Sequence, residues 1–364
     1  MPSRSILRRS VFLFISIQVY VIFAKSFEQL PGMKVGGISQ RQRFLRTLLG
    51  GETDRFPFFD LEPDEDTLGR WHREGFPPQQ LLSTYFGLEM HHSVGLMLRS
   101  YPFYQKAPGL LDDPSAFNRH YHPDQRSRYA RNFVKQSQRN HQQGRVLYVD
   151  ASGGGLLQML GVGDWDSLRA ACFALMKRPQ VVEDLVNRTT DFYCDCLERV
   201  LSKVSVDYAS FYEPIASNHA PVVSPAMFER FAIPGYRKVI DLLEKYRVPL
   251  RILCTTGGDL TSLLPSLINA GINGLWISNI RSAGMEYPKL RRQFGSEVAL
   301  IGGIDATALA RDEAAVRKAV KDTVPGLLES GHYLPCLDDR PRSAVPFAHY
   351  RLYRRLLEEI SRKG

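Results

Sequence analysis

The chain has only five cysteines in 364 residues, an odd and small number that does not fit a disulfide framework. They are Cys172, Cys194, Cys196, Cys254 and Cys336. Cys194 and Cys196 stand two residues apart in a helical pattern, where positions i and i+2 face different sides. We therefore expect no metal shared between these two thiols, and we expect stability to come from a buried apolar core.

Long apolar runs are also scarce. Val11 to Ala24 is short for a membrane span of roughly twenty residues, but Arg8 and Arg9 precede it as in a secretory signal. Three interpretations stay open: a signal or anchor, a translation start placed too early with Met33 as the internal start, or an ordinary helix. We treat residues 1–38 as an extension outside the fold. A cytoplasmic location is expected, although segment 8–26 leaves export or membrane anchoring open.

Basic charge is not concentrated along the chain. Lys+Arg 47 against Asp+Glu 38 gives +9, of which the first forty residues supply +4. The remaining positive charge is spread along the rest of the chain. Such a distribution is suited to binding anionic small molecules, whereas nucleic-acid binding needs a cluster of basic residues. The most basic tract, His120 to Arg145, is typical of a solvated helix.

From residue 200 onward, short apolar runs rich in aromatic and β-branched residues alternate with longer segments of helical period. Ser224 before Pro225 predicts a helix start, and Gly271 and Gly331 predict helix ends. Such alternation indicates parallel strands joined by crossover helices. The five predicted strands are 206–215, 249–255, 273–279, 297–305 and 332–338.

A closed barrel is favoured over an open sheet because no Gly-x-Gly-x-x-Gly follows an early strand. Three more strands are expected at FPFFDL (56–61), SVGLMLRS (93–100) and RVLYVDASG (145–153). Residues 39–364 are thus predicted to form one α/β domain, a (β/α)8 TIM barrel with an N-terminal helical extension. The helical tract from about 160 to 203 is expected outside the barrel.

In such barrels the reacting groups lie at the carboxyl ends of the strands. The residues at these positions include acids, a thiol and a basic side chain that could bind or transform a small molecule. They are Asp60, Asp150, Tyr212, Glu213, Cys254, Thr255, Thr256, Ser278, Asn279, Asp305, Cys336, Asp338, Asp339 and Arg340.

The segment from Phe211 to Tyr350 resembles the catalytic half of the uroporphyrinogen decarboxylase superfamily, which also contains corrinoid-linked methyltransferases. Four features occur in the same order: YEPIASNHAPVVSPAMFERFAIPGYRKVID, the corner Cys254 to Gly258, ALIGGID, and CLDDRP ahead of a terminal helix. RQRFLRTLLGGETDRFPFFDLEPDEDTLGRWHREG also resembles the superfamily's opening. The resemblance covers about residues 39–362.

Two departures from the family pattern bear on function. Porphyrinogen decarboxylases carry a basic run after their opening strand that holds substrate carboxylates, and Asp60 and Glu62 stand there instead. Methyltransferases of the superfamily place His-x-Cys where this chain has Cys254-Thr255-Thr256, with a further Cys near position 339. A zinc site needs three protein ligands and an open position, and only Cys254 remains as a soft ligand.

Several of these residues allow more than one interpretation. Cys254 could be a turn residue, a thiol that contacts substrate, or a metal ligand. Glu213 ends an apolar strand and is either paired or catalytic. Asp305 is either functional or a helix N-cap, and Asp338, Asp339 and Arg340 are either a structural ion-pair network or a binding site. The histidines His91, His92 and His219 are interpreted as surface or loop residues.

The resemblance implies a lyase of the decarboxylase type that acts on an anionic, possibly tetrapyrrole-related substrate by acid–base and electrostatic catalysis. Glu213 or Asp60 would donate a proton or stabilise a cation, with Asp305 assisting. The substrate would be bound by Tyr212, Cys254, Asn279, Asp338, Asp339 and Arg340. No cofactor or metal is expected, and a homodimer is possible. The alternatives are a methyltransferase with an altered zinc site and a corrinoid protein as partner, or a barrel that only binds a tetrapyrrole or corrinoid.

Overall fold

The structure is a computed structural model that describes residues 37–96, 117, 121–151, 155–162, 164–217, 219–255, 258–281 and 284–362. Seven parallel strands form one sheet in which the spatial order follows the chain order. They are β1 (His91–Ser93), β2 (Val146–Asp150), β3 (Tyr208–Tyr212), β4 (Leu250–Thr255), β5 (Gly274–Ile277), β6 (Ala299–Ile301) and β7 (Tyr333–Leu334). Consecutive strands lie side by side with helical connections, as expected for βα units.

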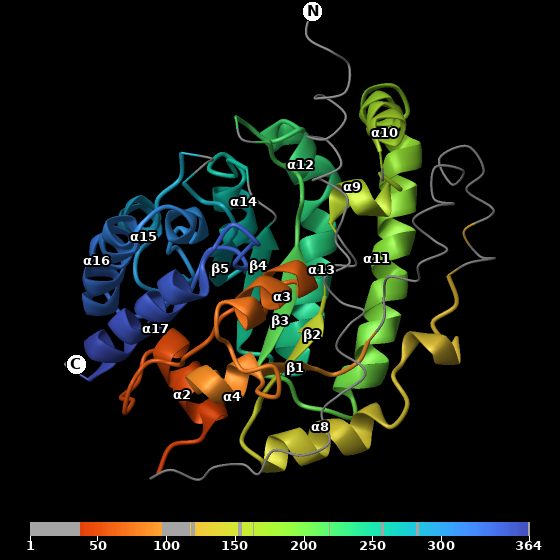
Figure 1. Ribbon diagram of the computed structural model, residues 1–364. Coiled ribbons are helices and arrows are strands. Elements are labelled where there is room, and N and C mark those ends of the chain that lie inside the picture. Colours follow the sequence, from red (N-terminus) through yellow and green to blue (C-terminus); the bar gives the residue numbers. More distant parts are fainter. Residues whose placement is uncertain are drawn as a thin grey trace, which may run out of the picture.

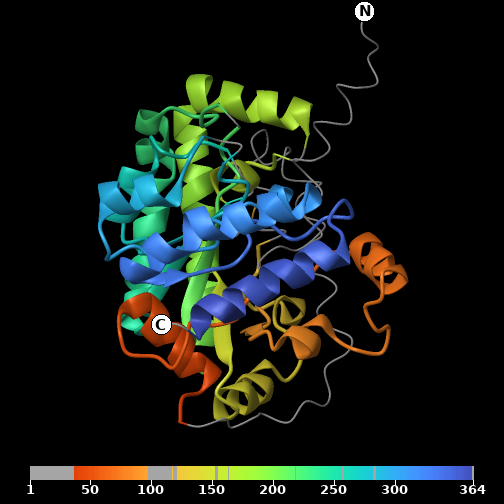
Figure 2. The same ribbon diagram turned by 60° about the vertical axis from the view of Figure 1, so that its left-hand side comes forward.

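The sheet is curled, with helices covering its outer side (Figures 1 and 2). Because side chains alternate along a strand, strands β2 to β7 contribute to two separate apolar clusters. The larger cluster lies between the sheet and the helices. The smaller one fills the inside of the curl and contains Phe44, Leu48, Phe59, Val146, Tyr208, Leu250, Ile252, Ala299, Ile301, Leu334 and Cys336. The fold is therefore α/β and TIM-barrel-like.

The five strands predicted after residue 200 are confirmed, although each is shorter than its apolar run. The run 145–153 is confirmed as β2. The strand expected at 93–100 is instead β1 at His91–Ser93, so it begins earlier, and residues 97–100 lie outside the described part of the chain.

The predicted eighth strand at 56–61 is wrong, because this segment forms no ladder in the structure. It nevertheless runs between the first and last strands: the Phe58 carbonyl accepts a hydrogen bond from Glu89 N at 2.7 Å, and Leu337 N donates to Asp60 Oδ1 at 3.0 Å. Pro57 has no N–H to offer, and the Asp60 carboxylate replaces a backbone acceptor. The described chain is thus a seven-stranded half-barrel with its gap lined by this segment.

The helices begin where capping residues supply acceptors for free N–H groups. Ser224 caps the helix that starts at Pro225, as the sequence predicted, and Asp312 and Asp64 cap two others. The described chain begins with helices at Gln40–Leu49 and Glu65–Arg73, and the tract from 160 to 203 lies outside the sheet, as expected. The principal helices are α2 (Gln40–Leu49), α3 (Glu65–Arg73), α4 (Leu82–Phe86), α8 (Phe133–Gln142), α9 (Leu156–Met159), α10 (Trp165–Lys177), α11 (Pro179–Leu201), α12 (Pro225–Phe231), α13 (Ile233–Lys245), α14 (Leu264–Asn269), α15 (Tyr287–Phe294), α16 (Glu313–Glu329) and α17 (Phe347–Ser361), with the 3-10 turn η5 (Ala306–Ala310).

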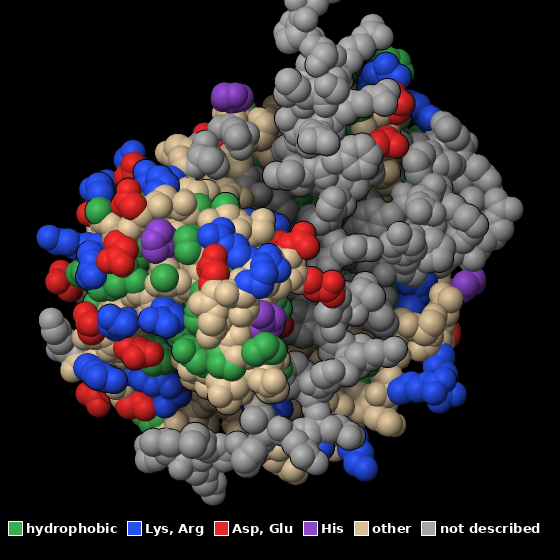
Figure 3. Space-filling view, in the orientation of Figure 1, with side chains coloured by type: hydrophobic (Ala, Val, Ile, Leu, Met, Phe, Trp, Pro, Cys, Tyr) green, Lys and Arg blue, Asp and Glu red, His purple; other side chains and the backbone are tan. Residues whose placement is uncertain are grey.

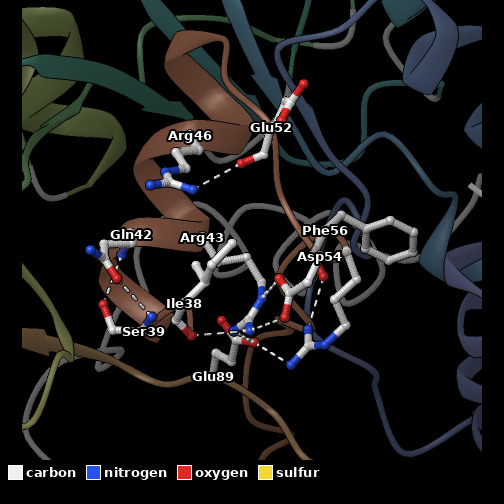
Figure 4. A network of polar contacts seen from close by, with 10 residues as sticks. Ile38, Ser39, Gln42, Arg43, Arg46, Glu52, Asp54, Phe56 and Glu89 are labelled. Carbon is white, nitrogen blue, oxygen red and sulfur yellow. Dashed lines mark hydrogen bonds and ion pairs between the residues drawn. The ribbon is translucent and has the colours of Figure 1, made fainter. Parts of the chain in front are cut away.

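Helix α2 closes the inside of the curl at the amino ends of the strands, where Phe44 packs on His91 and Tyr208. Figure 4 shows how it is fixed: Arg43 donates to both oxygens of Asp54 at 2.7 and 2.6 Å and to Glu89 at 2.9 Å. This end of the sheet is therefore filled by side chains, which leaves the carboxyl ends for a site.

Figure 3 shows that basic and acidic side chains are mixed on the side of the molecule formed by α15, α16 and α17. Within the described ranges no helix is long and apolar enough to cross a membrane. The apolar stretch Val11 to Ala24 lies outside those ranges.

Candidate active site at the carboxyl ends of the strands

Three side chains form a row across the inner surface of the sheet near its carboxyl end. Tyr212 on β3 is the register partner of Cys254 on β4, and Cys254 is the partner of Trp276 on β5. Tyr208 and Leu250, which belong to the inner cluster, lie four residues earlier on the same strands, so the row faces inward by the alternation of strands. The Cys254 thiol is half-buried here.

The inner surface has further aromatic side chains that the sequence had not indicated as part of a site. Trp276 packs edge-on against Phe59 with ring centroids 5.4 Å apart, and Tyr148 stacks on Tyr208 at 5.0 Å. The inward position of Trp276 could have been predicted from the sequence, because Trp276 lies two residues before Ser278 and therefore on the same face of the strand. Asp150 is the register partner of Ser210 and shares this face.

The glycine pair after β6 accommodates aromatic rings of the protein. A Cβ atom on Gly302 would lie 3.3 Å from the Trp276 ring, and one on Gly303 would lie 2.6 Å from the Tyr287 ring. Both glycines also have positive φ values. The atoms of the described chain nearest to these added Cβ positions are these two rings and the Leu337 carbonyl.

Asp338 joins three loops at the carboxyl end of the sheet. Its Oδ1 accepts from Ala306 N at 2.9 Å and its Oδ2 from Ile280 N at 3.2 Å, so the loops after β5, β6 and β7 meet at this carboxyl group. Burial raises the pKa of Asp338 to about 7, and the neighbouring Asp305 and Asp339 act in the same direction. The group is thereby poised to hold or release a proton near neutral pH.

Asp339 is more exposed than its neighbour and is surrounded by polar side chains. Its Oδ2 lies 3.0 Å from Arg342 Nη2 and 3.5 Å from Asn279 Nδ2, while its Oδ1 accepts from Arg340 N at 2.8 Å. Asn279 has φ +48, a left-handed conformation that places its side chain toward this loop. Two adjacent carboxyl groups, one buried and one ion-paired, are thus found in the same loop.

Asp305 caps η5, as one of its two interpretations predicted. Its Oδ1 accepts from Thr307 N at 2.9 Å and from the Thr307 hydroxyl at 2.5 Å. Ala306, the next residue, donates to Asp338. Asp305 therefore helps to position the acidic loop.

Glu213 lies on the opposite face of β3 from Tyr212 and is fully buried beneath helices. Leu156 N at the start of α9 donates to Oε1 at 3.1 Å, and Tyr236 Oη on α13 donates to Oε2 at 3.0 Å. Burial raises the pKa of Glu213 to about 8, against the effect of these two donors. Its catalytic role stays a prediction, since the side chain points away from the inner surface.

Asp60 is likewise directed outward, toward α17. It accepts from Arg354 Nη1 at 2.9 Å, Tyr350 Oη at 3.1 Å, Tyr353 Oη at 3.0 Å and Leu337 N. Burial raises the pKa of its carboxyl group, and the Arg354 guanidinium acts in the opposite direction. Four donors on one buried carboxylate are typical of a structural anchor, and a catalytic Asp60 also stays a prediction.

One of the three histidines lies where the sequence predicted, and the other two do not. His219 is an exposed loop residue, as predicted. His91 and His92 are wrong as loop residues, because both lie in β1, and the His91 ring stacks on Phe59 at 4.2 Å. Among the described residues, no group of three His, Cys, Asp or Glu side chains could hold a metal ion.

The structure therefore brings most of the predicted binding residues to one end of the sheet. Tyr212 and Cys254 are register partners, and Asn279, Asp305, Asp338, Asp339 and Arg340 form one connected cluster. Glu213 and Asp60 lie in the layer between sheet and helices. Thr256 lies outside the described residues.

Comparison with known proteins agrees with this arrangement. Residues 159–335, which include β3 to β7, match the family model described as uroporphyrinogen decarboxylase. Uroporphyrinogen decarboxylase 2, chloroplastic, of Oryza sativa subsp. japonica is 26% identical over 153 residues, covering 38% of this chain and 37% of that protein. The uroporphyrinogen decarboxylase of Cupriavidus pinatubonensis is 26% identical over 180 residues, covering 48% and 46%. Residues 159–335 are therefore similar to the uroporphyrinogen decarboxylase family.

The match spans less than half the length of these curated relatives. Among solved structures, a methyltransferase from Methanosarcina mazei has the same fold, with a TM-score of 0.59 and 15% identity over 89% of this chain and 99% of that one. The chain is therefore similar in sequence to the uroporphyrinogen decarboxylase family over residues 159–335, and it is similar in fold to a methyltransferase over almost all of its length.

Proposed function

We propose that this protein is a carboxy-lyase of the uroporphyrinogen decarboxylase type that removes CO2 from an electron-rich, anionic ring compound bound at the carboxyl ends of the strands. The observation that supports this most strongly is the pair Asp338 and Asp339. One carboxyl group is buried, with its pKa raised to about 7, and the other is ion-paired with Arg342. Two adjacent carboxyl groups in such different environments are suited to opposite roles in acid–base catalysis.

The proposed reaction needs a proton and a negative charge from the protein. A proton from the acidic loop adds to the ring carbon that bears the carboxylate. The carbon–carbon bond to the carboxylate then breaks, its electron pair returns to the ring, and CO2 leaves. Asp338 is the proposed proton source, and Asp339 stabilises the cationic intermediate. The reaction is redox-neutral and requires no other reactant.

Other residues would bind and position the substrate. Tyr212, Cys254 and Trp276 offer a flat, largely apolar surface for a ring, and Arg340 would hold an anionic group. Asp305 and Glu213 would act by positioning, the first through η5 and the second through the start of α9. Because Asp60 and Glu62 replace the basic run of the porphyrinogen decarboxylases, we favour a substrate with fewer carboxylates than uroporphyrinogen.

The test is a mass-spectrometric screen for loss of CO2 with uroporphyrinogen III and a panel of pyrrole and arene carboxylic acids. We expect turnover of at least one smaller acid, lowered by about 10²-fold or more in Asp338→Asn and retained in Cys254→Ala. Asp241→Asn, an exposed change on α13, is the control for carboxylate loss. Absence of CO2 release from every compound would refute the proposal.

Methyl transfer is the second candidate, favoured by the fold match and by the inward-facing Cys254 thiol. A zinc ion for thiol activation requires three protein ligands. The described residues do not provide them, so no step through zinc is proposed. Zinc retained on purification and lost in Cys254→Ala, together with demethylation of a methyl corrinoid, would favour this candidate.

A further inference from the structure

Helix α8 and the segment before it carry positive charge that no nearby acidic residue of the sequence balances. Between Asp124 and Asp150 the chain has six Lys and Arg residues and no Asp or Glu. Four of the six are exposed and form no ion pair with another residue of the described ranges. We call these four the α8 basic surface: Arg126, Arg131, Lys135 and Arg139.

Like charges are held close together on this helix. Lys135 and Arg139 are four residues apart on α8, so they are neighbours on one face, and like charges at this spacing destabilise a helix slightly. Burial lowers the pKa of the Arg145 guanidinium, and the positive charge of Arg139 acts in the same direction. The first turn of α8 has no acidic residue, although carboxylates are favourable there. Such local conflicts are expected where function requires them, here a negatively charged partner.

The α8 basic surface lies at the end of the molecule away from the proposed active site. Helix α8 ends at Gln142, just before β2 begins at Val146, so it lies at the amino ends of the strands. In Figure 1 it lies along the lower edge of the molecule, and Figure 3 shows basic side chains projecting from that edge. A partner bound there would leave the carboxyl ends of the strands open, so this inference does not rest on the proposed function.

The N-terminal part of the chain joins the fold beside the same surface. Arg41 N donates to the Gly144 carbonyl at 2.8 Å, so the start of α2 lies against the residues that follow α8. The described chain begins nearby, at Gly37, and the apolar stretch Val11 to Ala24 precedes it in the sequence. The segment 25–36 can span roughly 40 Å when extended. The apolar stretch can therefore reach a surface that α8 contacts.

We propose that the α8 basic surface docks on an anionic lipid bilayer, with its four cations next to the negatively charged headgroups. Each Lys or Arg near such a membrane strengthens binding about fivefold. A polybasic surface and an apolar element together bind a bilayer more stably than either does alone. A bilayer is favoured over nucleic acid, the other common polyanion, because the chain that joins the fold here carries an apolar stretch suited to acyl chains.

Co-sedimentation of the full chain with vesicles tests this proposal. We expect binding to vesicles of equal parts phosphatidylcholine and phosphatidylserine, and weaker binding at high salt, because salt screens exposed charges. The combined variant Arg131→Gln, Lys135→Gln and Arg139→Gln should bind about 10²-fold more weakly.

The matched control removes the same charge from another exposed surface. It combines Arg317→Gln, Lys318→Gln and Lys321→Gln on α16, where acidic side chains are interspersed. We expect this control to bind the vesicles almost as well as the wild type. Circular dichroism confirms that both triple variants are folded.

Four results would overturn the proposal: no vesicle binding by the wild type, equal binding to phosphatidylcholine alone, undiminished binding by the α8 triple variant, or an equal loss in the α16 control. Filter binding of single-stranded RNA is the parallel measurement. RNA binding that is lost in the α8 triple variant, without vesicle binding by the wild type, would identify a nucleic-acid surface instead.

Discussion

At the scale of single residues, two buried carboxyl groups near the sheet differ in their location and therefore in their expected roles. Asp338 and Glu213 are both held by backbone N–H donors in buried surroundings, with pKa values raised to about 7 and about 8. Only Asp338 belongs to the loop cluster at the carboxyl end of the strands. Its titration should therefore affect catalysis, and that of Glu213 should affect stability.

If Asp338 supplies the proton, kcat/KM should be constant below its pKa of about 7 and should fall tenfold per pH unit above it. Asp338→Asn should lower kcat by about 10²-fold or more and remove this dependence. Arg340→Met should mainly raise KM. A pH–rate profile that is unchanged in Asp338→Asn would show that another group carries the proton.

Glu213→Gln should change how stability depends on pH. The folded pKa of about 8 exceeds the ordinary 4.5, so the stability this group contributes is complete below 4.5 and is lost as the pH rises through about 8. The wild type should lose about 5 kcal/mol relative to Glu213→Gln across this window. Urea unfolding at several pH values measures it, with Glu229→Gln, an exposed change, as control; parallel curves would contradict the assignment.

At the scale of elements, Tyr287 on α15 connects the two strands β5 and β6 through one hydroxyl group. Ile277 N donates to it at 3.0 Å, and it donates to the Ile301 carbonyl at 2.5 Å, with the Leu275 carbonyl at 3.3 Å. Tyr287→Phe leaves buried backbone groups without this partner. We expect a loss of about 1–3 kcal/mol in the free energy of unfolding, against little change for the exposed Tyr85→Phe. Equal stabilities of the two variants would contradict this role.

The strands from β2 to β7 and their helices could be predicted from the sequence because apolar period, caps and terminal glycines all agreed. The segment 56–61 could not, since its apolar alternation resembles a strand while Pro57 and the Asp60 side chain replace ladder hydrogen bonds. Glu213 illustrates a second limit. Glu213 directly follows Tyr212, so the two side chains point to opposite faces of the sheet. Their position at the end of a strand did not reveal which of the two side chains faces inward.

At the scale of the whole molecule, Asp60 joins segments almost 300 residues apart. Its ion pair with Arg354 links the segment before β1 to the terminal helix α17, with both side chains buried. Removing one partner of a buried pair leaves an uncompensated charge. Arg354→Met should therefore cost about 3–5 kcal/mol in unfolding free energy, whereas the exposed Arg355→Met on the same helix should cost little. Similar urea midpoints for the two variants would show that the gap between β1 and β7 is held by other contacts.

The molecule as a whole is a curled parallel sheet closed at its amino end by α2, so the side chains that can meet a substrate gather at the other end. The most direct measurement is turnover in D2O of a carboxylate found active in the CO2 screen. The account predicts one solvent deuteron in the product for each CO2 released, in place of the lost carboxylate, with about 10²-fold slower product formation, or slower still, from Asp338→Asn. A product without deuterium, or undiminished turnover by Asp338→Asn, would contradict it.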